Sequence, residues 1–314
     1  EYPPAPEGDR RAMPITALAL RGEEELAVAG YHEITVWNAR SGALVRRLGG
    51  MPPKVLSLRA LEEGRKLLVG GGIAGRRGEV FLVDSRQGTI ETALPPAADL
   101  VWDVAPSPDG RFLAAAGADS NIRIFNLAER RLEQTLTNHS DWVQAVAWSQ
   151  DGKRLATASR DGSAKVISRE SGEVLASYSG HERPVTGIRF LPGDNELLSC
   201  GLDGKVHRWN AKEGKRIGNP GSVGGEAYRL LPAGEFCFVG GSEKKVMQWK
   251  PGDVQAPVRT FPGAAESILS LARSPGGKLL AAGDFSGEVL VWNAENGELL
   301  IRFRAAPGVE TTPE

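Results

Sequence analysis

The chain repeats one pattern along its length. Seven segments, each with four short apolar stretches separated by turn residues, occupy residues 15–50, 55–94, 101–137, 143–179, 185–220, 227–261 and 268–304. One position recurs in every segment at intervals of 40 to 46 residues: Trp37, Val83, Phe125, Ile167, Trp209, Trp249 and Trp292. A period of about 40–45 residues with four strands per unit is typical of a propeller blade.

A four-stranded unit cannot cover both of its apolar faces, so such units stack radially and bury these faces against two neighbours. We therefore predict an all-β, seven-bladed β-propeller with four antiparallel strands per blade, as a single domain over residues 15–305. Residues 1–14 are expected to be a linker or N-terminal extension, and residues 306–314 a C-terminal tail. Because each end of the repeat region contains a whole blade, the ring is expected to close by packing between blades alone.

Several short motifs accompany the repeat. They are Gly180-His181 before an inner strand, Ser107-Pro108-Asp109-Gly110 in a first hairpin turn, and the pairs Trp37-Asn38, Trp209-Asn210 and Trp292-Asn293 on third strands. In these residues the chain resembles the WD40 repeat family over nearly all of its length. It departs from the family's Trp-Asp signature by carrying asparagine as the second residue, and Ile167-Ser168 and Trp249-Lys250 keep little of the pair.

The resemblance implies a buried hydrogen-bond network in the fifth repeat. Its members are His181, Ser199, Asp203 and Trp209. We expect the indole to donate to the serine and the imidazole to bridge serine and aspartate, which satisfies each buried polar atom. The fourth repeat keeps part of this set: His139, Thr157 and Asp161, with Ile167 in place of the indole. A structural role is favoured over a Ser-His-Asp hydrolase, which is recognised by geometry and not by chain order.

The stretch GGGIAGRRG contains Gly70, Gly72 and Gly75 at the GxGxxG spacing of dinucleotide-binding loops. That loop works only where a strand is followed by a helix whose amino end faces the phosphate. Here a strand pattern, EVFLVD, follows instead. The glycines are therefore expected to form an enlarged hairpin loop between the second and third strands, with Arg76 and Arg77 on the rim and available to an acidic partner.

Composition excludes further classes of function. A net charge of −1 argues against a specific nucleic-acid surface, and no apolar run approaches the length of a membrane span. The two cysteines, Cys200 and Cys237, lie in strand-like runs and no CxxC or CxxCH motif is present, so buried free thiols are expected. We find no catalytic motif, and expect no metal, no cofactor and no enzymatic activity.

The family resemblance places the loops between second and third strands, and those between blades, on one rim called the top face, where proteins and peptides commonly bind. The candidate contact residues there are Tyr31, His32, Arg76, Arg77, Trp102, Trp142, Arg160, Lys244, Lys245 and Phe285, together with Ser120, Asn121 and Ser286. Aromatic and arginine side chains are the usual anchors of interfaces. For each residue singly, packing within its own blade or simple solvation is the alternative.

The leading interpretation is a non-catalytic scaffold that binds a protein or peptide at its top face, as a monomeric domain of a larger protein. The first alternative is a propeller enzyme or cofactor-binding domain of quinoprotein or lactonase type. Such proteins need clustered acidic, His or Arg groups at the channel, whereas the inner strands here read as mostly apolar or small. The second alternative is a structural spacer, for which alanine at Trp142, Arg76 and Arg77 would change no interaction.

A closer likeness involves the phrases VAGYHEITVWNA and SDWVQAVAWSQDGKRLATASRDGS. They resemble WD40 segments of bacterial cell-envelope proteins in which a cytochrome-c-like domain precedes the propeller. The likeness implies a bacterial envelope or periplasmic location, with the cytoplasm as the alternative.

Overall fold

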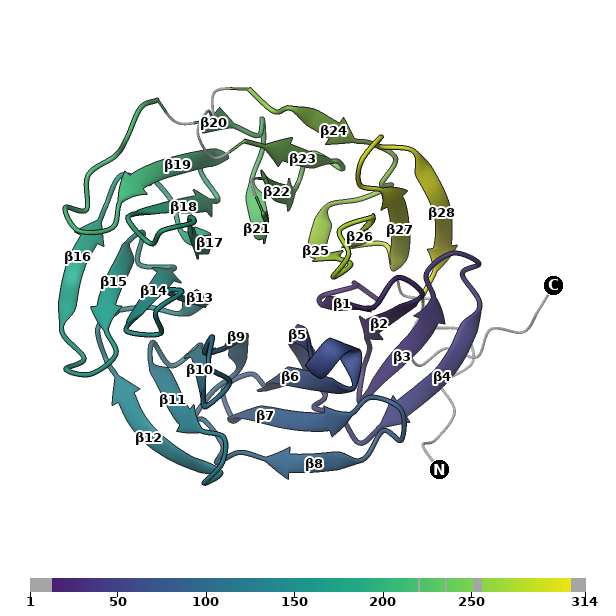
Figure 1. Ribbon diagram of the computed structural model, residues 1–314, viewed down its shortest axis with the longest axis horizontal. Helices are drawn as coiled ribbons and strands as arrows, with labels where there is room; N and C mark the ends of the chain where they lie inside the picture. Colours follow the sequence, from purple (N-terminus) through teal and green to yellow (C-terminus); the bar gives the residue numbers. More distant parts are fainter. Residues whose placement is uncertain (1–12, 220, 235, 251–255, 306–314) are drawn as a thin grey trace.

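The computed structural model describes residues 13–219, 221–234, 236–250 and 256–305. These residues form seven four-stranded antiparallel sheets, the blades, which Figure 1 shows arranged in a ring. The prediction of an all-β, seven-bladed propeller is confirmed. The expected tail and all but the last two residues of the expected N-terminal extension lie outside the described residues.

Each blade uses four strands that are consecutive in sequence, with the first strand nearest the centre of the ring in Figure 1. Blade 1 consists of β1 (Leu18–Arg21), β2 (Glu25–Ala29), β3 (Glu33–Asn38) and β4 (Leu44–Gly49). Blade 2 consists of β5 (Lys54–Leu61), the short 3-10 helix η1 (Glu62–Gly64), β6 (Lys66–Ile73), β7 (Arg77–Asp84) and β8 (Ile90–Ala93). Blade 3 consists of β9 (Val101–Pro106), β10 (Phe112–Gly117), β11 (Ile122–Asn126) and β12 (Arg131–Leu136).

The remaining blades follow the same order. Blade 4 consists of β13 (Val143–Trp148), β14 (Arg154–Ser159), β15 (Ala164–Ser168) and β16 (Val174–Tyr178). Blade 5 consists of β17 (Val185–Phe190), β18 (Glu196–Gly201), β19 (Lys205–Asn210) and the two-residue β20 (Gly221–Ser222). Blade 6 consists of β21 (Ala227–Ala233), β22 (Phe236–Gly241), β23 (Val246–Trp249) and β24 (Arg259–Phe261). Blade 7 consists of β25 (Ile268–Arg273), β26 (Leu279–Asp284), β27 (Glu288–Asn293) and β28 (Leu299–Arg304).

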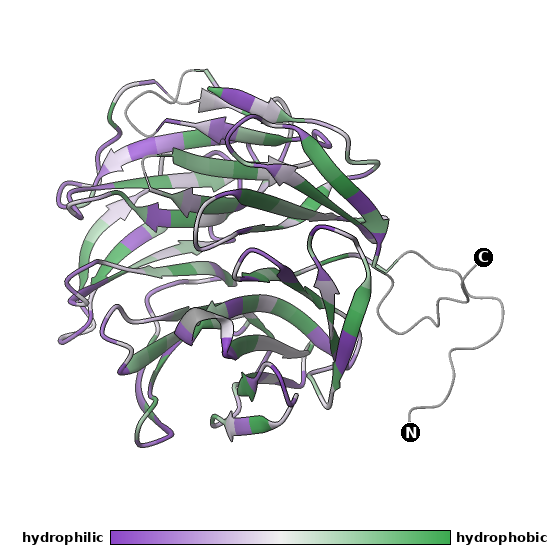
Figure 2. Cartoon of the chain, turned by 45° about the vertical axis from the view of Figure 1, so that its right-hand side comes forward, coloured by the Kyte–Doolittle hydropathy of each residue, from purple (hydrophilic) through white to green (hydrophobic). Residues whose placement is uncertain are grey.

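The core lies between the blades. The recurring residue of the repeat sits on the third strand and is buried in every blade, including Trp209, Trp249 and Trp292 at 0% exposure. Among the described residues, one cluster of buried apolar side chains fills each interface between neighbouring blades. Figure 2 shows the matching pattern, with hydrophobic colour along the strands and hydrophilic colour in many turns. Burial against two neighbours therefore holds each blade in the ring.

The ring closes between blade 7 and blade 1 without exchange of a strand, because both blades are built from consecutive strands. Ile15 is fully buried in the cluster at this interface. Three hydrogen bonds add to the packing: Ile15 N to Asp284 O at 3.0 Å, Ser270 Oγ to Ile15 O at 2.7 Å, and Gly276 N to Glu23 Oε1 at 3.0 Å. The prediction that each end supplies a whole blade is confirmed, but closure does not rest on packing alone.

The glycine-rich stretch forms a different hairpin from the one expected. Strands β6 and β7 are eight residues long and pair as far as Ile73 with Arg77, so only residues 74–76 form the turn. The prediction of an enlarged loop is wrong, because the extra residues lengthen the two strands. The glycines allow close backbone approach: a Cβ on Gly71 would lie 1.9 Å from Lys54 O, and Gly72 has a φ of 137°.

In the described part of the chain, no helix is long and apolar enough to cross a membrane.

Candidate functional site

Two consecutive repeat positions of every blade line the central channel. At the wider end of the channel, the first position supplies Thr16, Leu56, Trp102, Gln144, Thr186, Tyr228 and Leu269, which we call the upper ring. The next residue of each blade lines a narrower neck of about 40 Å³ and supplies Ala17, Ser57, Asp103, Ala145, Gly187, Arg229 and Ser270, which we call the lower ring. The upper ring and the adjoining loops enclose a cavity of about 710 Å³, the channel mouth.

The structure brings several predicted contact residues to the channel mouth. Tyr31 and Phe285, which are 58% and 54% exposed, line it together with Trp102. Trp142 packs beside Trp102 with ring centroids 5.6 Å apart, and the Arg160 guanidinium lies 4.6 Å from the centre of the Trp142 ring. Three aromatic residues of the predicted set thus share one cavity, and the other two residues extend it along the rim.

Other predicted contact residues do not line the mouth, and three of them have salt-bridge partners of their own. Arg77 pairs with Glu79 at 2.9 Å, Lys244 with Glu266 at 3.3 Å and Lys245 with Glu243 at 3.7 Å. Arg76 lies in the turn that joins β6 and β7. His32 has a φ of 61° and its ring contacts Tyr31 edge-on at 4.4 Å. Ser120, Asn121 and Ser286 lie in loops between second and third strands.

Sequence reasoning missed a cluster of charged groups in the channel. Asp103 is buried at 5% exposure and accepts hydrogen bonds from Ser57 Oγ at 2.9 Å and Arg59 Nη2 at 2.8 Å. Arg189 Nη2 lies 3.8 Å from the same carboxylate. Arg229 adds a third guanidinium. The expectation of mostly apolar or small inner strands is therefore wrong at the neck, and aligning the inner strands by repeat position is the signal that would have found these residues.

The electrostatics of this cluster favour the ionised carboxylate. Burial raises the pKa of Asp103, but the guanidiniums of Arg59, Arg189 and Arg229 outweigh it and leave the pKa below the ordinary value. Burial lowers the pKa of Arg189 to about 10 and also lowers that of Arg229. Arginine side chains nevertheless keep their charge in proteins at neutral pH. Three positive groups therefore share one negative group inside the neck.

The predicted network of blade 5 comes together in the structure. His181 Nδ1 lies 2.8 Å from Asp203 Oδ2, and His181 Nε2 lies 2.8 Å from Ser199 Oγ. The indole of Trp209 donates to Ser199 Oγ at 3.3 Å. Burial raises the pKa of Asp203, but the hydrogen bond and charge of His181, together with the backbone N–H groups of Lys205 and Glu182, outweigh it and lower the pKa overall. In blade 4, His139 bonds Asp161 at 2.8 Å and Thr157 at 2.7 Å without an indole.

Two further residues, missed from the sequence, extend this network. The ring of His207 stacks on that of His181 with centroids 4.1 Å apart and an interplanar angle of 15°. The hydroxyl of Tyr178 bonds His207 Nδ1, and the Tyr178 ring stacks on Trp209 at 5.2 Å. Tyr178 comes from the outer strand of blade 4, so the network spans two blades. The sequence alone does not indicate such a contact, because His207 is one of several polar residues in the third strand of its blade.

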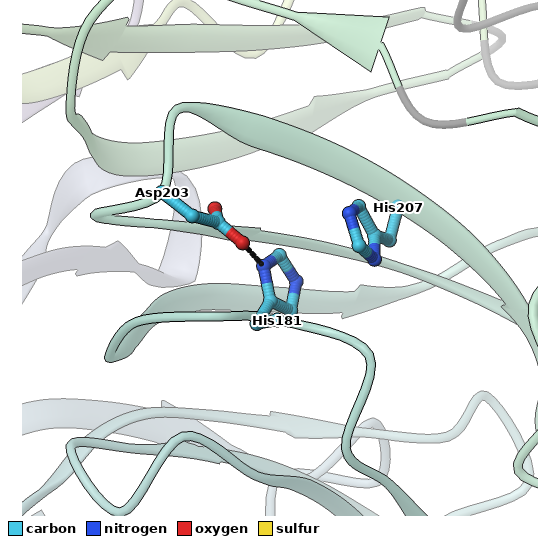
Figure 3. A group of neighbouring side chains, drawn as sticks. All are labelled: His181, Asp203 and His207. Atoms are coloured by element: carbon cyan, nitrogen blue, oxygen red, sulfur yellow. Dashed lines mark hydrogen bonds and ion pairs between the residues drawn. The ribbon is translucent and has the colours of Figure 1, made fainter.

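Among the described residues, one group of metal-binding side chains has its ligand atoms within 4.8 Å of one another: His181, Asp203 and His207 (Figure 3). Both nitrogens of His181 already make hydrogen bonds. The two imidazoles also face each other as stacked plates, whereas metal ligands converge in the planes of their rings. The arrangement therefore fits a hydrogen-bonded stack better than a metal centre. Cys200 and Cys237 are buried free thiols, as predicted.

We expect Asp203→Ala to lower the free energy of unfolding by about 1–3 kcal/mol, because it leaves His181 Nδ1 buried without its partner. Thermal and urea denaturation would measure the loss. Asp151→Ala, in an exposed turn of blade 4, is the matched control and should cost less. Equal stability of the two variants would contradict a structural role for the network.

The comparisons with known proteins agree with this geometry. The sequence model of the family described as "WD domain, G-beta repeat" matches residues 89–126, 130–168, 172–210 and 255–293. The first three matches each run from the outer strand of one blade through the third strand of the next. The family repeat is therefore offset from the blade by one strand.

Three curated proteins are similar in sequence to part of this chain. Apoptotic protease-activating factor 1 of Homo sapiens is 30% identical over 38% of this chain and 10% of its own length. Zinc finger CCCH domain-containing protein 17 of Oryza sativa subsp. japonica is 32% identical over 40% of this chain and 28% of its own length. WD repeat-containing protein 81 of Danio rerio is 31% identical over 43% of this chain and 7% of its own length. The chain thus spans less than a third of the length of each of these relatives.

Proposed function

We propose that this seven-bladed propeller, in which four stretches match the WD repeat model, is a non-catalytic scaffold that binds a protein or peptide at the channel mouth of its top face. The single observation that carries the proposal is the mouth itself, a cavity of about 710 Å³ to which every blade contributes at least one residue. That size lies within the usual range of about 300–1,000 Å³ for ligand pockets. WD40 propellers generally bind proteins, which agrees with this use of the mouth.

The composition of the mouth also supports binding. Tyr31 and Phe285 stand more than half exposed at its edge, and Trp102 and Tyr228 form part of its wall. Large aromatic side chains anchor interfaces because they contribute much contact area for few rotamers. An edge of aromatic residues around a concave site is therefore suited to receive side chains of a partner.

The groups that could carry out chemistry are already engaged. Both nitrogens of His181 are bonded inside blade 5. Burial raises the pKa of Cys200 to about 11 and that of Cys237 to about 12, so neither thiol is an effective nucleophile at neutral pH. Asp103 is ion-paired in the neck. These contacts favour a binding role over the quinoprotein or lactonase class.

Affinity capture with a top-face variant tests the proposal. Alanine at Tyr31, Trp142 and Phe285 together is expected to weaken partner binding at least tenfold, because it removes the aromatic edge of the mouth. The matched control is alanine at Arg40 and Lys212, which lie in turns on the opposite rim. If the top-face variant and the control variant both gave the same capture result as wild type, the role of a structural spacer would be favoured. Stoichiometric cofactor or substrate turnover by the purified protein would favour an enzyme.

We also propose that the chain is a monomeric part of a larger bacterial cell-envelope protein with a cytochrome-c-like domain. The phrases VAGYHEITVWNA and SDWVQAVAWSQDGKRLATASRDGS support this parent. The three relatives above are eukaryotic, and their similarity supports the repeat alone. The full reading frame tests the proposal, since a parent without a CxxCH motif would contradict it.

A further inference from the structure

We propose that the channel mouth recognises an acidic side chain flanked by apolar side chains in a peptide partner, with the carboxylate of that side chain paired to Arg229. This inference rests on the proposed scaffold function and names the chemistry of its ligand. It follows from the charge of the inner strands, the position of Arg229 and the apolar wall above it.

The inner strands carry charge of almost one sign. Their charged residues are Arg21, Lys54, Arg59, Asp103, Arg189, Arg229 and Arg273, of which only Asp103 is acidic. Of these, Lys54, Arg59, Asp103, Arg189 and Arg229 line the mouth or the neck, so the channel carries an excess of positive charge although the chain as a whole has a net charge of −1. A cleft lined by one sign of charge raises the local concentration of the opposite charge.

The channel mouth itself has the same bias. Among the described residues that line it, Lys54 and Arg229 are cationic and none is acidic. Glu226, which accepts a hydrogen bond from the hydroxyl of Tyr228 at 2.7 Å, is paired with Arg183 at 2.7 Å. A cation inserted into the mouth would meet repulsion, whereas a carboxylate would meet opposite charge.

Arg229 forms the floor of the mouth. Its Nε donates to Leu269 O of the neighbouring blade 7 at 3.0 Å, and its Nη2 donates to Leu56 O of blade 2 at 3.3 Å. Because blades 7 and 1 lie between blades 6 and 2, the side chain reaches across the channel. It lines both the mouth and the neck. Two backbone bonds hold the guanidinium in place, so little further ordering is needed to bind a carboxylate.

The wall above Arg229 is mostly apolar. Leu56, Trp102, Tyr228 and Leu269 belong to the upper ring, and Ile73 reaches the mouth from the β6–β7 hairpin. Apolar side chains of the peptide would pack against this wall while its acidic side chain reaches Arg229 at the floor of the mouth.

Selection from a random heptapeptide phage library against the wild-type protein tests this chemistry. We expect enrichment of peptides with Asp or Glu next to Leu, Ile, Phe or similar residues. Arg229→Gln should lose the preference for the acid and keep the preference for apolar residues. Arg40→Gln, which changes an exposed arginine on the opposite rim, should behave as wild type. Circular dichroism and thermal melting would establish that each variant is folded.

A synthetic pair of peptides then measures the contact. The most enriched peptide and its Glu→Gln or Asp→Asn partner are titrated into wild type and Arg229→Gln. The neutral peptide should bind wild type about tenfold more weakly, as expected for one charge-assisted hydrogen bond, and the two peptides should bind Arg229→Gln about equally.

The outcomes separate the inference from the function it rests on. Wild-type enrichment of neutral or basic peptides would overturn the carboxylate pocket and leave the scaffold standing. An undiminished preference for the acid in Arg229→Gln would overturn the role of Arg229. Absence of any enrichment above a bare support would overturn both the pocket and peptide binding by the mouth.

Discussion

Replacing Asp103 with alanine is expected to lower the free energy of unfolding by about 3–5 kcal/mol, because it leaves buried guanidiniums without their shared counter-charge. The carboxylate contacts Arg59 at 2.8 Å and Arg189 at 3.8 Å, and it also accepts from Ser57 and from Val146 N. Urea denaturation at neutral pH would measure the loss. Asp109→Ala, an exposed aspartate in the following turn, is the matched control.

A second substitution identifies the cause of that loss. If repulsion among the guanidiniums destabilises Asp103→Ala, then adding Arg189→Met should recover part of the stability, because one of the unpaired charges is removed. If Asp103→Ala were only as costly as Asp109→Ala, or if the second substitution destabilised it further, the neck would not be held by its carboxylate.

The same carboxylate predicts a dependence on pH. Its pKa in the folded protein lies below the ordinary value of 3.8, so the ion pairs stabilise the fold fully above that pH. Their contribution is lost as the pH falls through the folded pKa, because the neutral acid no longer offsets the arginines. The difference in stability between wild type and Asp103→Ala should therefore shrink below about pH 3.8.

The fold was predictable from the sequence because its determinants are repeated. The buried residue of the third strand recurs in every blade, and each interface between blades buries a cluster of apolar side chains. Independent copies of a weak strand pattern thus reinforce one another. The extension of β6 and β7 was not predictable, since extra residues between two strands can lengthen either the loop or the ladder. In this hairpin the extra residues lengthened the paired strands, because glycines permit the close approach of the backbones there.

The candidate site was only partly predictable, because its contacts join residues far apart in sequence. The bonds of His181 to Ser199 and Asp203 lie within one blade and follow from the repeat. By contrast, Arg229 meets Leu56 only when the ring closes. Each charged residue of the channel stands at a repeat position where most other blades carry a small or apolar residue. Asp103 of blade 3, for example, is replaced by Ala145 at the same position of blade 4. A pattern search that looks for similarity passes over such departures.

The second large effect is expected at His207, whose folding contribution depends on pH. Burial, aided by the nearby charge of His181, lowers the pKa of His207 from 6.5 to about 4. The folded protein therefore holds this imidazole neutral, whereas the unfolded chain takes up a proton as the pH falls below 6.5. Stability is lost over this interval, and the difference in pKa corresponds to about 3 kcal/mol. The charged neighbours on the packed elements are Asp203, Lys205 and Arg216.

Two substitutions at His207 separate titration from hydrogen bonding. Asparagine places an amide where Nδ1 meets the Tyr178 hydroxyl, whereas glutamine places it nearer the position of Nε2. Both variants should lose less stability than wild type between pH 7.5 and pH 4.5 in urea denaturation, because neither side chain titrates. Only His207→Asn should stay close to wild type at pH 7.5, since it alone keeps the hydrogen bond between position 207 and the Tyr178 hydroxyl. A wild-type pH profile in both variants would show that another group, and not His207, carries the acid sensitivity of the propeller.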